Sequence, residues 1–237
     1  MNTKKIEYEE NGTTLEAFIA FEGKEGVKKP AICIFHAWKG RDEFAEKMAV
    51  RLASLGYIGC ALDMYGKGVL GSSARENSSL MMPLIEDRLA LRRRCLAGLE
   101  LVKQLPDVDV AKVGAIGFCF GGLCALDLAR SGADIKGVVS FHGLLHPPLQ
   151  LPTHCKAKIL VLHGHDDPMV TPKDVLAFEE EMTKQKVDWQ VHIYGGAMHA
   201  FTNPSAQDAS AGTLYNTTAE RRSMASMKQF FDEIFSS

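Results

Sequence analysis

The sequence predicts an α/β fold in which a mostly parallel central sheet carries helices on both faces. Short, continuous apolar runs alternate along the chain with longer segments whose apolar residues recur every three or four positions. This alternation is typical of parallel strands that are connected by helices. Two strand-like segments flank the turn signal Asn11–Gly12 before the alternation begins. We therefore expect an N-terminal antiparallel hairpin that leads into the parallel sheet.

The expected elements are given in chain order. The hairpin is predicted over 5–10 and 13–21, and further strands over 31–36, 58–64, 113–118, 137–142, 158–163 and 189–194. Most of these later runs are apolar without alternation, which indicates strands buried on both faces. Helices are predicted over 42–56, 82–105, 120–132, 172–186 and 218–235. Residues 64–80 and 202–217 lack periodicity and are rich in small polar residues, so we expect loops there. The first is a candidate lid, with an ordinary surface connection as the commoner role of such a segment.

Length and charge limit the classes of function. The chain has 237 residues, 46% of them hydrophobic, which predicts a single domain over residues 1–237 with a full core. Its 27 basic and 29 acidic residues nearly balance, without long blocks of one sign. This balance argues against nucleic acid or a membrane surface as a partner. We expect a small-molecule substrate and a monomer or small homo-oligomer.

Cysteine usage indicates the compartment. The chain has 6 cysteines, scattered without paired CxxC spacing. A chain of this length does not need disulfides, and neither a secretion signal nor a membrane-spanning run is recognised in it. We therefore expect free thiols in a cytoplasmic protein, and no zinc finger or zinc ribbon.

One short segment carries the candidate nucleophile. Residues 117–122 read GFCFGG at the end of a predicted strand, which matches a G-x-C-x-G form of the turn on which hydrolases present a nucleophile. Glycines are needed there because the turn strains its central residue and brings helix and strand close together. The Cys119 sulfur would then lie at a helix N-terminus, where partial positive charge favours a thiolate. The alternative is an inert thiol in a glycine-rich bend, which is the commoner role of a free cysteine.

Two further groups come after later predicted strands. Asp167 lies in HGHDDPMV and His199 in YGGAMHAFTNP. Ligands of open α/β sheets bind beyond the carboxyl ends of the strands, so we expect these groups to meet Cys119 there. The chain order nucleophile, acid, histidine is that of the α/β-hydrolases. Asp166 is an alternative acid, and Asp167 is preferred because the DPMV segment is typical of an anchored turn.

These segments carry a resemblance. Together with LDMYGKG at 62–68 and SFHG at 140–143, they resemble the dienelactone hydrolase family of α/β-hydrolases over essentially the whole chain. The resemblance implies the α/β-hydrolase fold and an enzyme that needs no metal and no organic cofactor.

The resemblance also implies roles for individual residues. It implies a catalytic triad of Cys119, His199 and Asp167. The implied oxyanion hole consists of the backbone N–H groups of Phe120, directly after the nucleophile, and of Trp38 in the segment HAWKG.

The sequence departs from the family pattern at two places. Ala37 stands where the family usually has a glutamate that contacts the nucleophilic thiol. The thiol then needs another activator, and His199 with the helix terminus, or the neighbouring His36, can serve. Asn203 stands where the family's dienelactone enzymes have an arginine that holds the substrate, so we expect another substrate. Candidates for lining the pocket are His36, Ala37, Trp38, Phe141 and His142, and core packing is the commoner role of the last three.

The sequence therefore predicts a carboxylic ester hydrolase with a cysteine nucleophile, acting on small, activated esters, lactones or thioesters. Two alternatives stay open. One is a thiol redox sensor in which Cys119 is oxidised or capped, and the other is an inactive scaffold that keeps the fold. A metal site at HGHDD (163–167) is not favoured, because alternate strand residues diverge and no HExxH helix supplies further ligands.

Overall fold

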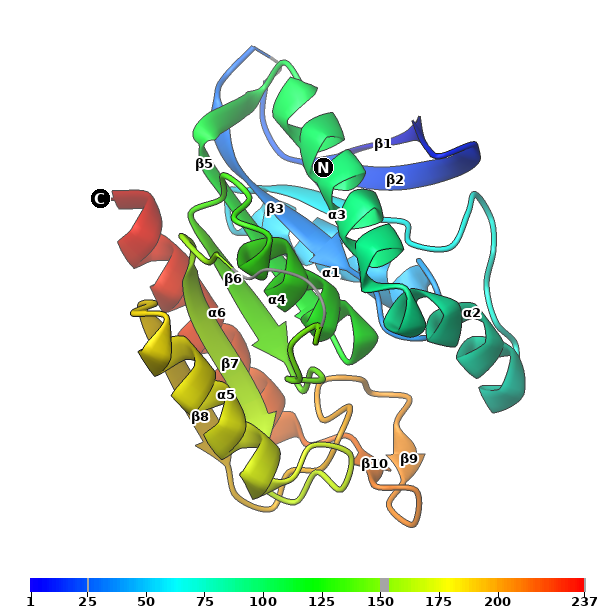
Figure 1. Ribbon diagram of the computed structural model, residues 1–237. Coiled ribbons are helices and arrows are strands. Elements are labelled where there is room, and N and C mark those ends of the chain that lie inside the picture. Colours follow the sequence, from blue (N-terminus) through cyan, green and yellow to red (C-terminus); the bar gives the residue numbers. More distant parts are fainter. Residues whose placement is uncertain (25, 150–153, 237) are drawn as a thin grey trace. The chain divides into compact units, whose positions relative to one another are not determined.

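The computed structural model describes residues 1–24, 26–149 and 154–236. The contacts within the chain divide it into two compact units, Met1–Ile116 (unit 1) and Gly117–Ser237 (unit 2). Each unit is an α/β arrangement in its own right (Figure 1). The single domain over 1–237 stays a prediction. No helix within the described ranges is long and apolar enough to cross a bilayer.

Unit 1 contains the predicted hairpin. Its strands are β1 (Asn2–Glu10), β2 (Thr13–Phe21), β3 (Lys29–Phe35), β4 (Ile58–Leu62) and most of β5 (Val108–Phe118). β1 and β2 pair antiparallel around Asn11 and Gly12, whose φ angles of 47° and 76° suit a tight hairpin turn. β2 pairs antiparallel with β4, and β4 pairs parallel with β3. The prediction of an N-terminal hairpin is confirmed.

Helices cover both faces of β4. The helices of unit 1 are α1 (Glu43–Ser54), α2 (Ala74–Glu86) and α3 (Arg88–Gln104). A Cβ on Gly59 would lie 2.3 Å from the Ala49 carbonyl oxygen of α1, so only glycine allows this approach. Leu62 contacts Gly98 of α3. Because Gly59 and Leu62 are three positions apart in one strand, they face opposite sides of the sheet. The helices α1 and α3 therefore lie on opposite sides of β4.

The structure corrects one predicted helix and one predicted loop. The helix expected over 82–105 is two helices, and α2 begins at Ala74, within the expected loop 64–80. Ser73 caps α2, and Asp87 caps α3, each by accepting a backbone N–H three residues further on. Serine and aspartate favour caps as well as turns, so the composition that predicted a loop also contained the start signals of these helices.

Unit 2 contains the remaining strands and helices. They are α4 (Phe120–Arg130), β6 (Gly137–Phe141), β7 (Lys158–Gly164), α5 (Pro172–Lys184), β8 (Trp189–Tyr194), β9 (Gln207–Asp208), β10 (Thr213–Leu214) and α6 (Thr217–Ser236). β6, β7 and β8 pair in parallel. β6 and β7 are almost entirely buried, as their continuous apolar character predicts, whereas β8 is partly exposed. β9 and β10 form a short hairpin inside the segment expected to be a loop.

The helices α4 and α6 cover opposite faces of β6 (Figure 1). A Cβ on Gly137 of β6 would meet Ile234 of α6 at 2.6 Å, and the Ser140 hydroxyl lies 2.5 Å from a Cβ on Gly122 of α4. Gly137 and Ser140 are three positions apart, so they face opposite ways. The two helices therefore pack against opposite faces of the sheet in this unit.

A buried ion pair joins three parts of unit 2. Arg130, at the end of α4, has no exposed surface. Its Nε and Nη2 atoms donate to the two carboxylate oxygens of Glu181 in α5, at 2.9 and 2.6 Å. Nη2 also donates to the Leu145 carbonyl at 2.7 Å. The Arg130 guanidinium therefore connects α4, the helix after the candidate nucleophile, to α5 and to the loop after β6.

We expect Arg130→Met to lower the free energy of unfolding by about 3–5 kcal/mol, because it removes the positive charge that faces the fully buried Asp127 carboxylate and the partly buried Glu181 carboxylate. Urea unfolding followed by circular dichroism measures this loss. Arg221→Met, at an exposed position of α6, is the control and should change stability by less than about 0.5 kcal/mol. Equal effects of the two substitutions would contradict the structural role of the buried pair.

Candidate active site

Cys119 lies on the sharp turn that its glycines predict. It joins β5 to α4 with a φ of 55° and a ψ of −116°, a conformation that side chains rarely adopt. A Cβ on Gly117 would lie 1.8 Å from the Gly121 carbonyl oxygen, and one on Gly122 would lie 2.6 Å from the Cα of Gly143. These glycines are therefore needed to bring strand, turn and helix together.

The turn presents the sulfur at the start of a helix. Cys119 is half-buried and precedes Phe120, the first residue of α4. Its own backbone N–H donates to the Phe141 carbonyl at 3.1 Å, and its carbonyl accepts from the N–H of Gly122 at 3.0 Å. The positive end of the helix dipole at this point favours a negative charge on the sulfur.

Asp167 and His199 form a buried hydrogen-bonded pair. His199 Nδ1 lies 2.7 Å from Asp167 Oδ2, and the two residues are 2% and 3% exposed. The other oxygen of Asp167 accepts from the backbone N–H groups of Met169 and Val170, at 2.8 and 3.2 Å. Asp166, the alternative acid, is exposed. The geometry thus sets Asp167 rather than Asp166 against the imidazole, with the DPMV turn anchoring the carboxylate.

The charge environment of His199 favours its protonated form. Burial lowers the pKa of His199, but the charge of Cys119, hydrogen bonds to Asp167 and Cys119, and the charge of Asp167 together raise it to about 10. Asp167 engages Nδ1, which leaves Nε2 as the ring nitrogen for the hydrogen bond to Cys119. Cys119 acts on the imidazole from within the same unit, so the three groups form one electrostatic system.

Two neutral histidines flank this pair. The ring of His142 packs edge-on against that of His199, with centroids 5.2 Å apart, and its Nε2 lies 2.8 Å from the Thr202 hydroxyl. Burial and then the charge of His199 hold the pKa of His142 well below its usual range. Burial also lowers the pKa of His163, although the charge of Asp167 opposes this. Burial therefore opposes a second positive charge beside His199.

The remaining predicted site residues of unit 2 have structural contacts. Phe141 is fully buried, and its ring stacks on Phe118 with centroids 4.8 Å apart. His142 is only 2% exposed and has a φ of 39°. Both residues lie directly beneath the turn of Cys119, because Phe141 accepts its backbone N–H. Their candidate role in lining a substrate pocket stays a prediction.

The predicted site residues of unit 1 come directly after β3. The Met64 N–H donates to His36 Nε2 at 3.1 Å, and His36 Nδ1 lies 2.7 Å from the Ala37 carbonyl. Both nitrogens of this buried ring are thus engaged, and burial lowers the pKa of His36. The Trp38 carbonyl accepts from the Tyr65 hydroxyl at 3.0 Å. These contacts fix the backbone of 36–38 within unit 1.

Thr202 and the segment 206–216 contribute to the site although the sequence did not single them out. Thr202 is buried and hydrogen-bonded to His142, which lies 60 positions earlier in the chain. Segment 206–216 accepts and donates backbone hydrogen bonds at His199. In the sequence, these residues stand out locally by a polar composition without periodicity. An ordinary surface loop has the same composition, so it did not reveal their role at the site.

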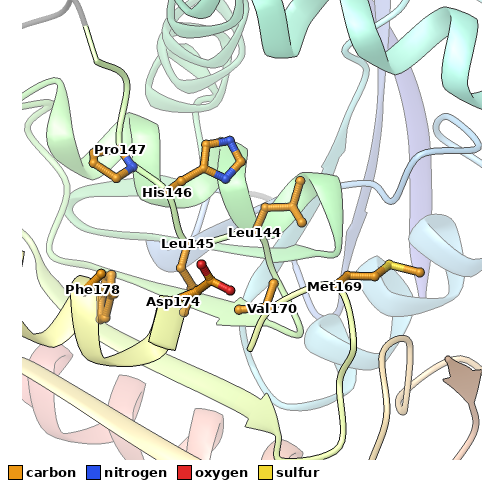
Figure 2. Close-up of a pocket in the computed structure, with 9 residues that line it drawn as sticks. Leu144, Leu145, His146, Pro147, Met169, Val170, Asp174 and Phe178 are labelled. Atoms are coloured by element: carbon orange, nitrogen blue, oxygen red, sulfur yellow. The ribbon is translucent and has the colours of Figure 1, made fainter. Parts of the chain in front are cut away.

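A small cavity of about 130 Å³ lies beside the loop that carries Asp167 (Figure 2). His146 and Asp174 supply polar groups to its wall. The loops after β6 and β7, together with α5, supply its apolar lining, which includes Leu144, Leu145, Met169, Val170, Ala177 and Phe178. The loops that hold His142 and Asp167 thus also shape an apolar hollow. Within the described ranges, no three His, Cys, Asp or Glu side chains gather as a metal site would require.

We expect Cys119→Ala to lower the pKa of His199, because the largest influence that raises it is removed while burial remains. In the unsubstituted protein, the imidazole should keep its second proton until about pH 10. A ¹⁵N NMR titration of the His199 ring nitrogens measures the pKa in the unsubstituted protein and in the Cys119→Ala protein. Cys155→Ala, which removes another half-buried thiol, should leave the titration unchanged. An identical titration in the Cys119→Ala protein would contradict the electrostatic coupling.

Comparison with known proteins places the chain in a family. The model of the dienelactone hydrolase family matches residues 15–235. A dienelactone hydrolase-like promiscuous phosphotriesterase from metagenomic libraries is similar in structure, with a TM-score of 0.93, 38% sequence identity and 98% of both chains covered. This similarity confirms the predicted α/β-hydrolase fold class.

Two curated relatives extend the comparison. A Caenorhabditis elegans protein of uncharacterized function is 43% identical over 149 residues, which are 61% of this chain and 94% of the relative. A putative carboxymethylenebutenolidase of Aquifex aeolicus is 28% identical, over 86% of this chain and 88% of the relative. The family resemblance inferred from the sequence is therefore confirmed, and the chain belongs to the dienelactone hydrolase family of hydrolases.

Proposed function

We propose that this hydrolase acts on small, activated esters, lactones or thioesters through Cys119 as the nucleophile. The observation that supports the proposal most strongly is the buried hydrogen bond between His199 and Asp167, combined with the effect of Cys119 on the pKa of that imidazole. A nucleophile, a histidine and an orienting carboxylate are the parts that acyl transfer requires.

The first half-reaction forms an acyl-enzyme. The Cys119 thiolate attacks the substrate carbonyl, and the carbonyl π electrons move to oxygen. The N–H of Phe120 at the start of α4 stabilises this oxyanion. The tetrahedral intermediate collapses, the bond to the leaving group breaks, and the His199 imidazolium gives that group a proton. Trp38 belongs to unit 1, and its part as second oxyanion donor stays a prediction from the resemblance.

The second half-reaction releases the acid. His199, now neutral, takes a proton from water while the water oxygen attacks the thioester carbonyl. Collapse of this second tetrahedral intermediate breaks the C–S bond, releases the acid and expels the Cys119 thiolate, which again lies beside the imidazolium formed when His199 took the proton from water. Asp167 remains ionised throughout and holds the imidazole in one tautomer and orientation. A thioester needs a well-placed water for deacylation, which favours small, activated acyl groups.

The proposal also covers the cellular compartment, the need for a cofactor and the assembly of the enzyme. The nucleophile is a thiol, and the cysteines that the structure describes form no disulfide, which suits the reducing cytoplasm. The mechanism uses side chains and backbone groups of this chain, so we propose no cofactor. We propose one catalytic domain over residues 1–237, as a monomer or small homo-oligomer.

Phosphotriester hydrolysis is a second candidate function. The observation that favours it is the 38% identity to the promiscuous phosphotriesterase, over 98% of this chain. The same thiolate would attack phosphorus, expel an aryloxide and leave a phosphorylated sulfur that water then hydrolyses. If one site performs both reactions, an aryl phosphotriester should inhibit ester turnover competitively, and Cys119→Ala should abolish both.

We expect Cys119→Ala to lower kcat for p-nitrophenyl acetate by about 10⁴-fold or more, because the nucleophile is lost. Cys155→Ala is the matched control, since it removes a second half-buried thiol whose pKa burial raises to about 11. Release of p-nitrophenolate measures turnover. Undiminished turnover in the Cys119→Ala protein would remove the thiol from the mechanism.

We expect Asp167→Asn to lower kcat by about 10³–10⁴-fold, because the amide cannot stabilise the imidazolium and favours the wrong tautomer. Asp166→Asn changes the adjacent, exposed carboxylate in the same way, and turnover should stay within about twofold of the unsubstituted enzyme. A larger loss in the Asp166→Asn enzyme would transfer the acid role to that residue.

The redox-sensor alternative makes a different prediction. If Cys119 serves acyl transfer, a slowly hydrolysed ester should block both its alkylation by iodoacetamide and its oxidation by mild peroxide, as seen by mass spectrometry. Because His199 stays protonated to about pH 10, alkylation should remain fast well below the ordinary thiol pKa of about 8.5. Rapid oxidation without any ester turnover would favour the sensor, and inertness in both assays would favour a scaffold.

A further inference from the structure

The loop that carries His199 is paired with a later part of the chain. We call residues 206–216, which include β9 and β10, the strap. The His199 N–H donates to the Gly212 carbonyl at 3.0 Å, and the Leu214 N–H donates to the His199 carbonyl at 3.1 Å. The Asn216 N–H donates to the Phe201 carbonyl at 3.0 Å. The backbone on both sides of the imidazole is therefore fixed by the strap.

The strap also contacts the loop that carries Asp167. A Cβ on Gly212 would lie 2.1 Å from Cγ of Pro168 and 2.7 Å from its Cδ. Pro168 directly follows Asp167, and the φ of Gly212 is +77°. Gly212 thus contacts the loops of both candidate catalytic residues: its carbonyl accepts the His199 N–H, and its Cα packs on Pro168, next to Asp167.

A second junction lies between the two loops themselves. The Asp166 N–H donates to the Ala197 carbonyl at 2.9 Å, and a Cβ on Gly164 would lie 2.5 Å from the same oxygen. This junction holds the loops where they leave β7 and β8. The strap holds them further along, at His199 and Pro168. Two junctions limit a hinge movement that one junction alone would permit.

The strap has its own internal support. The Asp208 carboxylate accepts from the Ser210 hydroxyl at 2.6 Å and from the Ala211 N–H at 3.0 Å. These hydrogen bonds lower the pKa of Asp208. The Gly212 N–H donates to the Ala209 carbonyl at 3.0 Å. The turn that presents Gly212 is thereby closed by hydrogen bonds among exposed groups of the strap itself.

We propose that Gly212 is a positioning residue: its bare Cα lets the strap close on Pro168 and so sets the His199 imidazole against Asp167. This inference rests on the proposed function, because it assigns the strap to the same site. A displacement of about 1 Å in a catalytic group can reduce turnover about a hundredfold. A side chain at position 212 has no room unless the strap or the aspartate loop moves.

The chain offers a matched control for Gly212→Ala. Gly196, in the same histidine loop, has a φ of +74°, but nothing lies within 4 Å of a Cβ placed there. Both alanine substitutions impose the same backbone strain, and only Gly212→Ala adds the contact with Pro168. We expect Gly212→Ala to lower kcat for p-nitrophenyl acetate about a hundredfold with little change in KM, and Gly196→Ala to change kcat less than about threefold.

Two further measurements distinguish positioning from a loss of stability. The Nδ1 proton shared by His199 and Asp167 should give a downfield ¹H NMR signal that weakens in Gly212→Ala and persists in Gly196→Ala. Adding Pro168→Ala to Gly212→Ala removes the ring atoms in the way, and should restore most of the signal and turnover relative to Pro168→Ala alone. If Gly212→Ala does not fold, Asp208→Ala takes its place as a variant at an exposed position. This substitution loosens the turn and should weaken the same NMR signal.

The outcomes separate this inference from the proposed function. Equal kcat and equal NMR signals in Gly212→Ala and Gly196→Ala would overturn the role of Gly212, even if turnover depends fully on Cys119. If Gly212→Ala does not fold, an unchanged signal in Asp208→Ala would overturn it. If turnover does not depend on Cys119, the proposed function fails, and the NMR comparison alone decides whether Gly212 sets the histidine against Asp167.

Discussion

The hydrogen bond between His199 and Asp167 is the interaction on which the candidate site depends. Both side chains are almost fully buried, and a charged carboxylate in such surroundings is stable only when donors surround it. Asp167 has three N–H donors, two from its own turn and one from the imidazole. The turn therefore stabilises the carboxylate, and the carboxylate in turn fixes the histidine.

Burial also controls the charges around this pair. It lowers the pKa of His142 and His163, whereas the neighbouring charges of Cys119 and Asp167 raise that of His199. The three histidines of this unit thus differ in the direction of their pKa shifts, because the charges and hydrogen bonds of Cys119 and Asp167 outweigh burial only at His199. A single imidazolium beside the thiol is the arrangement that a cysteine nucleophile requires.

Backbone strain gathers around the same groups. Cys119, His142 and Ala200 all have positive φ angles, at 55°, 39° and 57°. Such conformations persist only where surrounding contacts enforce them, and they are common at functional sites. Here the enforcing contacts are the glycines beside Cys119, the Thr202 hydroxyl on His142, and the strap on both sides of Ala200.

The sequence by itself determined the α/β class, the N-terminal hairpin, the family and the order of the candidate catalytic segments. These features rest on local patterns, namely apolar periodicity, the Asn11–Gly12 turn and the glycines around Cys119, so neighbouring residues are enough to reveal them. The start of α2 was missed because a serine such as Ser73 suits a helix cap and a loop equally well.

Only the tertiary structure decided the contacts between distant segments. Asp166 and Asp167 have the same side chain, and the direction of the turn after β7 alone sets one inward and leaves the other exposed. The packing of Gly212 on Pro168 joins positions 44 residues apart. Neither residue type signals its partner, because the close approach of a glycine Cα to a proline ring depends on where the strands and loops place them in space.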